Sequence, residues 1–137
     1  MRSLFPSTLD VIQKNLDLRH DRHKILTSNV ANAETPGYVA KDMYFEDALR
    51  QAAQPPQQGT MQRTHPHHFP APGPSLTEVK GTVAASSSDD VGNDRNTVSL
   101  DQQMAKLTMN TFHYNASTEI LSRMLGQIKR TISEGGR

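Results

Sequence analysis

The stretch that decides the fold reads Asn29-Val30-Ala31-Asn32-Ala33-Glu34-Thr35-Pro36-Gly37-Tyr38. A long helical pattern precedes it, and we expect that helix to end by about Ala33, because Pro36 lacks an N–H and restricts the residue before it. Pro36-Gly37 suits the two central positions of a type II turn, since glycine accepts a positive φ. Asn29 and Asn32 lie three residues apart on one helix face, where their amides are placed to bond freed carbonyls or a neighbouring chain.

Before this turn, the chain carries the apolar spacing of a long helix. Ser7 is placed to cap its N-terminus. Intervals of three and four between apolar residues are typical of a coiled-coil seam. The apolar members of this first seam are Leu9, Ile12, Leu16, Leu26 and Val30. Arg19 and His23 interrupt the seam, and they either face a partner chain or extend along its edge.

A second and stronger seam follows Val98. Ser99 and Gln102 form a capping box before it, and a four-three alternation is then sustained to the end of the chain. The apolar members of this second seam are Leu100, Met104, Leu107, Tyr114, Leu121, Leu125, Ile128 and Ile132. Because a further apolar flank lies beside it, we expect this helix to contact more than one partner. The flank consists of Met109, Phe112, Ile120 and Met124.

Between the two seams, the composition changes and excludes a long helix. Six of the eight prolines fall between residues 55 and 74, and proline interrupts helical hydrogen bonding. Residues 84–90 form a polar run of low complexity with nothing to bury. Helical spacing returns for one or two turns at residues 45–50. Short extended segments are expected at residues 39–44, 60–64 and 76–83.

These patterns predict a mainly α fold. We expect the long N- and C-terminal helices to pair as an antiparallel coiled coil, with a Pro-rich extended or irregular middle segment. Residues 1–50 then hold the first helix, the turn and a short helix, and residues 98–137 hold the C-terminal helix. Together they form one axial domain, and residues 51–97 form a Pro/Ser-rich loop that lies outward.

The amino-acid composition argues against several classes of protein. Hydrophobic residues make up 34% of the 137 residues, and even with the eight glycines added the content lies below the roughly 45–50% of ordinary globular domains. Fifteen basic and fourteen acidic residues are spread along the chain, for a formal net charge of +1, which argues against a nucleic-acid interface with clustered cations. The chain has no cysteine, so it forms no disulfide. We expect no membrane span and no cleaved signal peptide.

Histidines are the candidate metal ligands. His65, His67 and His68 form a short tract, and His20 and His23 lie at i, i+3. Imidazole binds zinc, but no paired carboxylate accompanies the tract, and we favour a solvated loop over a metal site. The serines and aspartates of residues 86–90 offer a nucleophile and an acid in a segment that fixes no catalytic geometry. We therefore expect no catalytic, metal or cofactor site.

Residues 29–38 resemble the N-terminal signature of the bacterial flagellar rod and hook family, and residues 40–42 and 45–46 also resemble that family. The signature residues are Asn29, Ala31, Asn32, Thr35, Pro36, Gly37 and Tyr38. The C-terminal seam, from Val98 through Tyr114 to residues 121–123, resembles the end of a proximal-rod subunit. One departure is Gln102-Gln103, since the family tends to carry an acidic residue before the methionine, and this puts any charge pairing there in doubt.

The resemblance implies a structural, non-enzymatic subunit of the flagellar rod, which assembles into a hollow helical tube, transmits torque and lines the export channel. Implied partners are rod proteins similar to FlgC, FlgF and FlgG, the rod-base adaptor FliE and the flagellar export gate, with no nucleic acid and no direct lipid anchor. The implied location is the basal body in the periplasmic space, after export without a cleaved signal.

Phe45 and Leu49 have the spacing that the family associates with docking at the export gate, and local packing is the equal alternative. The alternative function, from the helical patterns alone, is a soluble coiled-coil adaptor or a chaperone-like binding module.

Overall fold

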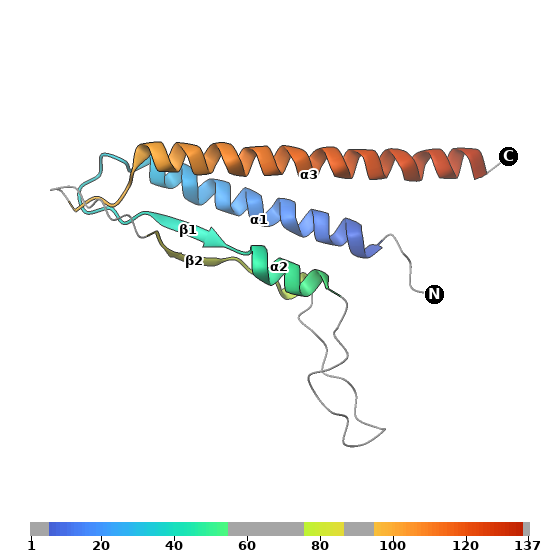
Figure 1. Ribbon diagram of the computed structural model, residues 1–137, viewed down its shortest axis with the longest axis horizontal. Helices are drawn as coiled ribbons and strands as arrows, with labels where there is room; N and C mark the ends of the chain where they lie inside the picture. Colours follow the sequence, from blue (N-terminus) through green and yellow to red (C-terminus); the bar gives the residue numbers. More distant parts are fainter. Residues whose placement is uncertain (1–5, 55–75, 87–94, 136–137) are drawn as a thin grey trace, which may run out of the picture.

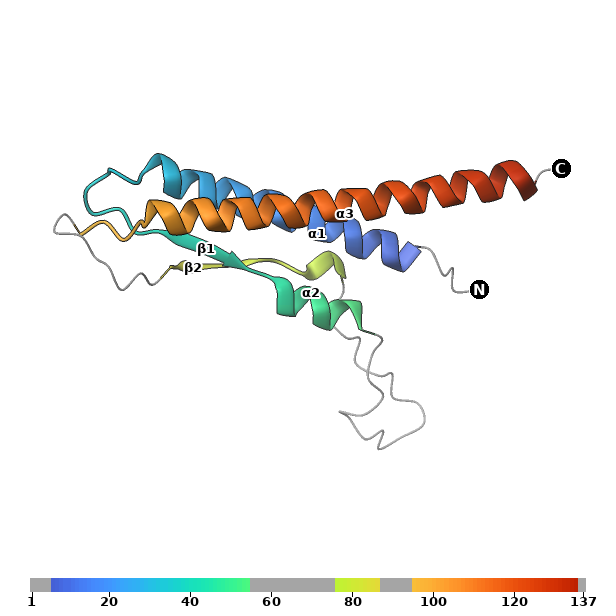
Figure 2. The ribbon, with the colours of Figure 1, turned by 45° about the horizontal axis from the view of Figure 1, so that its top comes forward.

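The computed structural model describes residues 6–54, 76–86 and 95–135. Two long helices, α1 (Pro6–Ala31) and α3 (Leu100–Gly135), lie side by side and antiparallel. Below the two helices in Figure 1 lie strand β1 (Lys41–Tyr44), helix α2 (Glu46–Ala53), a 3-10 turn η1 (Leu76–Glu78) and strand β2 (Thr82–Ala85). α1 is therefore the central element, in contact with α3, β1, α2 and η1. Figure 2 shows that α3 continues past the start of α1.

The mainly α fold and its two long terminal helices are confirmed. α1 ends at Ala31, two residues before the predicted limit, and α3 begins directly after Ser99. α1 begins at Pro6, and the side chain of Ser7, which was predicted to cap it, lies outside the described part of the chain. Proline suits the first turn of a helix, where its missing N–H has no helical acceptor to lose.

The hydrophobic core lies between α1 and the sheet side of the molecule. Its buried members are Leu18, Met43, Phe45, Leu49 and Val79. They come from α1, β1, α2 and the segment after η1, so the core excludes α3. Sequence periodicity pointed to the two long helices as the site of apolar packing, whereas the hydrophobic core lies between α1, β1 and α2.

The surface between α1 and α3 is polar at its centre. The buried residues of α3 are Gln103 and Asn110, which are not members of the predicted seam. Within that seam, the side chains of Leu107, Leu121 and Ile128 are half-buried. Its exposed members are Leu100, Met104, Tyr114, Leu125 and Ile132. In the first seam, Leu26 is buried and Leu9, Ile12, Leu16 and Val30 are half-buried. A coiled-coil pairing along these seams therefore stays a prediction.

The prediction of an extended segment at residues 39–44 is confirmed by β1, which pairs antiparallel with β2 from Lys41 opposite Ala85 to Tyr44 opposite Thr82. The strand expected at residues 76–83 is wrong over most of its length, because residues 76–78 form η1 and the strand begins only at Thr82. All four residues of β2 are exposed, so its backbone pairing with β1 holds the strand in place. No face of β2 is buried, and its sequence therefore lacks the alternation of apolar and polar residues that predicts a strand.

Gly81 precedes β2 where the backbone passes close to β1. A Cβ atom at this position would lie 2.3 Å from Cε of Met43 and 2.6 Å from its Cγ, inside van der Waals contact. Met43 is buried in the core, so only glycine brings β2 this close without displacing it. The predicted extended segment at residues 60–64 and the prolines between 55 and 74 lie outside the described residues.

None of the helices in the described part of the chain is long and apolar enough to cross a membrane.

Candidate functional site

The side chain of Asn29 joins three elements at the end of α1. It is fully buried, and its Nδ2 donates to the backbone oxygen of Lys41 at 2.6 Å and to Oε1 of Gln103 at 3.0 Å. Its Oδ1 accepts from the backbone N–H of Lys41 at 3.1 Å and from the hydroxyl of Tyr38 at 3.3 Å. All four hydrogen-bonding positions of the amide are thus used. One asparagine therefore fixes α1, β1 and α3 relative to one another.

The turn that follows has the predicted geometry. The N–H of Tyr38 donates to the carbonyl of Thr35 at 3.2 Å, which places Pro36 and Gly37 at the two central positions. Gly37 has a φ of +72°, as the third position of a type II turn requires. Pro36 and Gly37 are exposed, so the turn shapes the path of the chain and contributes nothing to the core.

Asn96 caps the turn from the distant segment that leads into α3. Its buried side chain lies with Nδ2 at 3.2 Å from the carbonyl oxygen of Asn32, 2.7 Å from that of Ala33 and 2.9 Å from that of Thr35. These carbonyls follow the end of α1, and those of Asn32 and Thr35 also accept a backbone N–H of the turn. The same side chain accepts from the N–H of Val98 at 2.8 Å. We call Asn29, Tyr38, Lys41, Asn96 and Gln103 the asparagine junction.

The other signature residues support the junction locally. The Nδ2 of Asn32 donates to the carbonyl of Ser28 at 2.8 Å, and its Oδ1 accepts from the hydroxyl of Thr35 at 3.3 Å. Ala31 is exposed. The two asparagines thus have different roles, because Asn29 bonds other elements of the fold while Asn32 bonds its own helix end.

A buried carboxylate lies beside the junction, on β1. Asp42 is 2% exposed and accepts two hydrogen bonds from Arg22 of α1, at 2.9 and 3.2 Å. Nζ of Lys106 on α3 lies 3.1 Å from its Oδ2, and the N–H of Met43 donates to it at 2.8 Å. Burial opposes the charge, but the bonds from Arg22, Met43 and Lys106 outweigh it and lower the pKa of Asp42. Asp42 therefore stays ionised and ties α1, β1 and α3 together a second time.

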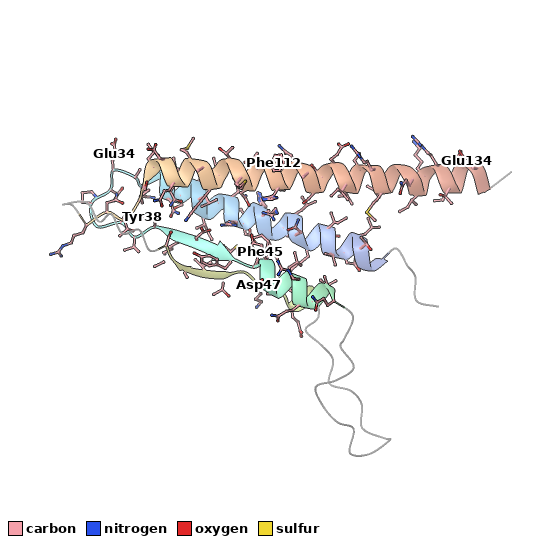
Figure 3. All side chains as sticks on the ribbon, viewed as in Figure 1. Glu34, Tyr38, Phe45, Asp47, Phe112 and Glu134 are labelled. Carbon is pink, nitrogen blue, oxygen red and sulfur yellow. The ribbon has the colours of Figure 1, made fainter. Side chains whose placement is uncertain are left out.

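The two residues of the predicted export motif lie in the core. Phe45 is 2% exposed and Leu49 is 9% exposed, and Figure 3 marks Phe45 at the junction of β1 and α2. The guanidinium of Arg19 lies 5.5 Å from the centre of the Phe45 ring, a cation–π distance. Both motif residues are packed in the folded chain.

The histidines fall in two places. His65, His67 and His68 lie outside the described residues. His20 and His23 lie on α1 beside α3, and among the described residues no group of three His, Cys, Asp or Glu side chains is arranged to hold a metal ion. Of the run at 86–90, the structure describes Ser86, whose hydroxyl accepts from Lys106 at 3.1 Å.

Comparison with known proteins identifies the family. No protein-family model matches the chain. A protein of Cereibacter sphaeroides named flagellar basal body rod protein FlgB is 33% identical over 128 residues, which cover 93% of this chain and 95% of the relative. The protein of that name from Escherichia coli K12 is 34% identical over 121 residues, covering 85% and 84%. The chain belongs to the FlgB family of flagellar basal body rod proteins. A FlgB protein of Bacillus subtilis is 27% identical over 135 residues, covering 98% and 99%.

Of the two residues noted as a departure, Gln102 is exposed and Gln103 is buried. In this member of the FlgB family, the side chain at position 103 is 2% exposed and accepts a hydrogen bond from Asn29. The amide oxygen of Gln103 supplies the acceptor that the buried Nδ2 of Asn29 needs. Sequence reasoning missed the junction role of Gln103, and the signal that was present was a polar residue placed within an apolar helical pattern.

Proposed function

We propose that this FlgB-family chain is a structural subunit of the proximal flagellar rod, which assembles with other rod proteins into a hollow helical tube. The observation that carries the proposal is the apolar surface that α3 exposes. Phe112 is 66% exposed, and Figure 3 marks it on α3. The other large exposed apolar residues of α3 are Leu100, Met104, Met109, Tyr114, Ile120, Leu125 and Ile132. So many exposed large apolar side chains on one helix make that helix a candidate protein interface.

The shape of this surface favours an open assembly. It extends along a helix that continues beyond α1 (Figure 2), so a neighbour is able to pack lengthwise against it. A head-to-tail contact between unlike surfaces that does not close on itself generates a helical filament. In this proposal residues 1–50 and 98–137 form the axial domain, with the α1 and α3 seams completed as coiled coils by neighbours, while residues 51–97 lie outward.

Replacing Phe112 by Asp tests the assembly surface. The side chain is mostly exposed in the single chain, so we expect the folding free energy to change by no more than about 0.5 kcal/mol. In the rod the new carboxylate becomes buried without a partner, which costs several kcal/mol, and the rod and motility are lost. Electron microscopy of basal bodies and a swimming assay measure the outcome.

Asn115→Asp is the matched control, because Asn115 is exposed on the same helix and is not part of the apolar surface. We expect Asn115→Asp cells to swim. Swimming Phe112→Asp cells with complete basal bodies would refute the role of this surface.

We further propose that Phe45 and Leu49 dock at the flagellar export gate before the chain folds. Because both side chains are buried in the folded core, the export gate has access to them only in an unfolded chain. Export through a narrow channel also requires an unfolded chain, and the absence of cysteine leaves no disulfide to prevent it. In this proposal the exported subunit then lies in the periplasmic space.

The double variant Phe45→Ala/Leu49→Ala is expected to accumulate in the cytoplasm. Leu26→Ala is its control, because Leu26 is equally buried and its truncation costs about 2–5 kcal/mol of folding free energy outside the motif. We expect Leu26→Ala to be exported and to fail only in assembly. Immunoblots of cytoplasmic and exported fractions measure both, and equal export of the two variants would reduce Phe45 and Leu49 to packing residues.

The remaining partners follow from the proposed place in the rod. We propose contacts with rod proteins similar to FlgC, FlgF and FlgG and with the rod-base adaptor FliE, through which the subunit transmits torque and helps to line the export channel. No step of this function requires a catalytic group or cofactor.

A further inference from the structure

Two of the chain's sulfur atoms lie on the exposed apolar surface of α3. Of the six methionines in the sequence, Met109 is 61% exposed and Met104 is 47% exposed. Met43 is only 8% exposed and belongs to the hydrophobic core, and Met124 is half-buried. The fold therefore gives solvent access to the thioethers of Met104 and Met109 and shields that of Met43.

Each exposed methionine lies beside another apolar residue of this surface. Phe112 follows Met109 by three positions and Leu100 precedes Met104 by four, and these spacings make side chains neighbours on a helix. Phe112 is 66% exposed and Leu100 is 50% exposed. A neighbouring subunit that packs on α3 would therefore bury each sulfur together with the adjacent apolar side chain.

Exposure of a thioether matters because a peroxide oxidises it without a catalyst. With hydrogen peroxide, a sulfur lone pair attacks one peroxide oxygen, so that an S–O bond forms and the O–O bond breaks. The departing hydroxide takes the proton from the transferred oxygen, and the products are one sulfoxide and one water. This reaction converts a flexible apolar side chain into a polar one. Burial of the S–O group without a hydrogen-bond donor is unfavourable.

We propose that Met104 and Met109 are sites of oxidation to methionine sulfoxide by peroxides, and that the oxidised chain is excluded from the rod. The inference rests on the proposed rod function and makes its assembly surface sensitive to oxidants. Because a neighbour covers α3 in the rod, the two sulfurs react in the unassembled chain and are protected after assembly. Oxidation disrupts contacts made by methionine, which otherwise packs as an adaptable apolar side chain.

Peroxide treatment of the purified full chain tests the exposure argument. The chain is kept in an osmolyte buffer that favours the folded state, and peptide mass spectrometry quantifies the sulfoxide at each methionine over time. We expect Met104 and Met109 to oxidise about tenfold or more faster than Met43, because reactivity follows access to the sulfur. In concentrated urea the three rates converge. Equal rates in the folded chain would overturn the assignment of these two sites.

Two double variants test the effect of the modification on assembly. Met104→Gln/Met109→Gln imitates the sulfoxide with a polar, uncharged side chain of similar length. Met104→Leu/Met109→Leu is the matched control, because leucine is apolar and close to methionine in volume. Both positions are exposed, so we expect both variants to fold. With each variant as the sole copy in the cell, quantitative mass spectrometry of purified basal bodies is expected to show about fivefold or less of the normal amount for the Gln variant and the normal amount for the Leu variant.

Peroxide treatment of cells that are building rods tests the oxidised chain itself. Wild-type chains within basal bodies are expected to carry at least about fivefold less sulfoxide at Met104 and Met109 than unassembled chains. The Leu variant continues to assemble at a peroxide dose that lowers wild-type incorporation. Equal sulfoxide in the two pools, or equal incorporation of the Gln and Leu variants, overturns the proposal. Absence of the wild-type chain from basal bodies of untreated cells would instead refute the proposed rod function itself, so the two failures are distinguished.

Discussion

Asn29→Asp is expected to lower the free energy of unfolding by about 3–5 kcal/mol and to abolish rod assembly. The substitution preserves the shape of the side chain but replaces its N–H₂ donor by an oxygen. The new carboxylate then faces the backbone oxygen of Lys41 and Oε1 of Gln103, which Asn29 contacts at 2.6 and 3.0 Å. A buried charge that faces two acceptors and keeps only the uncharged donors of Lys41 and Tyr38 accounts for this magnitude.

Asn32→Asp is the matched control for this prediction. Asn32 is half-buried, and its Nδ2 donates to the carbonyl of Ser28, so we expect a loss of only about 1 kcal/mol. Thermal unfolding followed by circular dichroism, in a buffer with an osmolyte that favours the folded state, measures both variants. Equal unfolding midpoints for the two would show that Asn29 does not hold the three elements together.

The contrast between Asn29 and Asn32 also separates the features that the sequence could predict from those that it could not. Both were singled out by their spacing and by the turn after them, and the helix end, the turn type and the positive φ of Gly37 follow from local chemistry. The partners of Asn29 could not be predicted in the same way. Gln103 is 74 residues away, and no local pattern couples positions at that distance.

The same limit applies to Asn96 and Asn110. Asn96 bonds carbonyls at the end of α1 from 61 to 64 residues away, and Asn110 bonds the carbonyl of Arg19 from 91 residues away. Periodicity identified the apolar surface of α3, but it assumed that the apolar surface faces α1. In the single chain the buried residues of α3 are Gln103 and Asn110, and hydrogen bonds from Asn29 and Asn110 join the helices there, whereas the seam residues Leu107, Leu121 and Ile128 are only half-buried.

The burial of Phe45 and Leu49 also limits when the predicted export motif is able to bind. The spacing of Phe45 and Leu49 is the same whether the pair docks at an export gate or packs in a core, so the sequence left both possibilities open. In the structure both side chains belong to the core. The two roles are compatible only if docking precedes folding, which is why the export experiment needs a core variant outside the motif.

Asp42→Asn is expected to lower the free energy of unfolding by about 3 kcal/mol, the lower end of the range for breaking a buried ion pair. The substitution removes the negative charge that Arg22 and Lys106 share, at 2.9 and 3.1 Å. Arg22 retains Glu46, which limits the loss. Asp47→Asn is the control, since the side chain of Asp47 is 87% exposed and lies 3.6 Å from Arg50, and such surface pairs contribute little.

The pH dependence of this effect has a defined sign. The pKa of Asp42 is lower in the folded chain than in the unfolded chain, where aspartate titrates near about 3.9. Its ionised form therefore contributes its full stabilisation above the unfolded pKa, and this is lost as the pH falls through the folded pKa. The gap in stability between the wild type and Asp42→Asn should stay constant from neutral pH down to about 5 and narrow below about 4. Urea unfolding across this range measures the gap, and a gap that widens on acidification would mean that Asp42 is not the charged centre joining α1, β1 and α3.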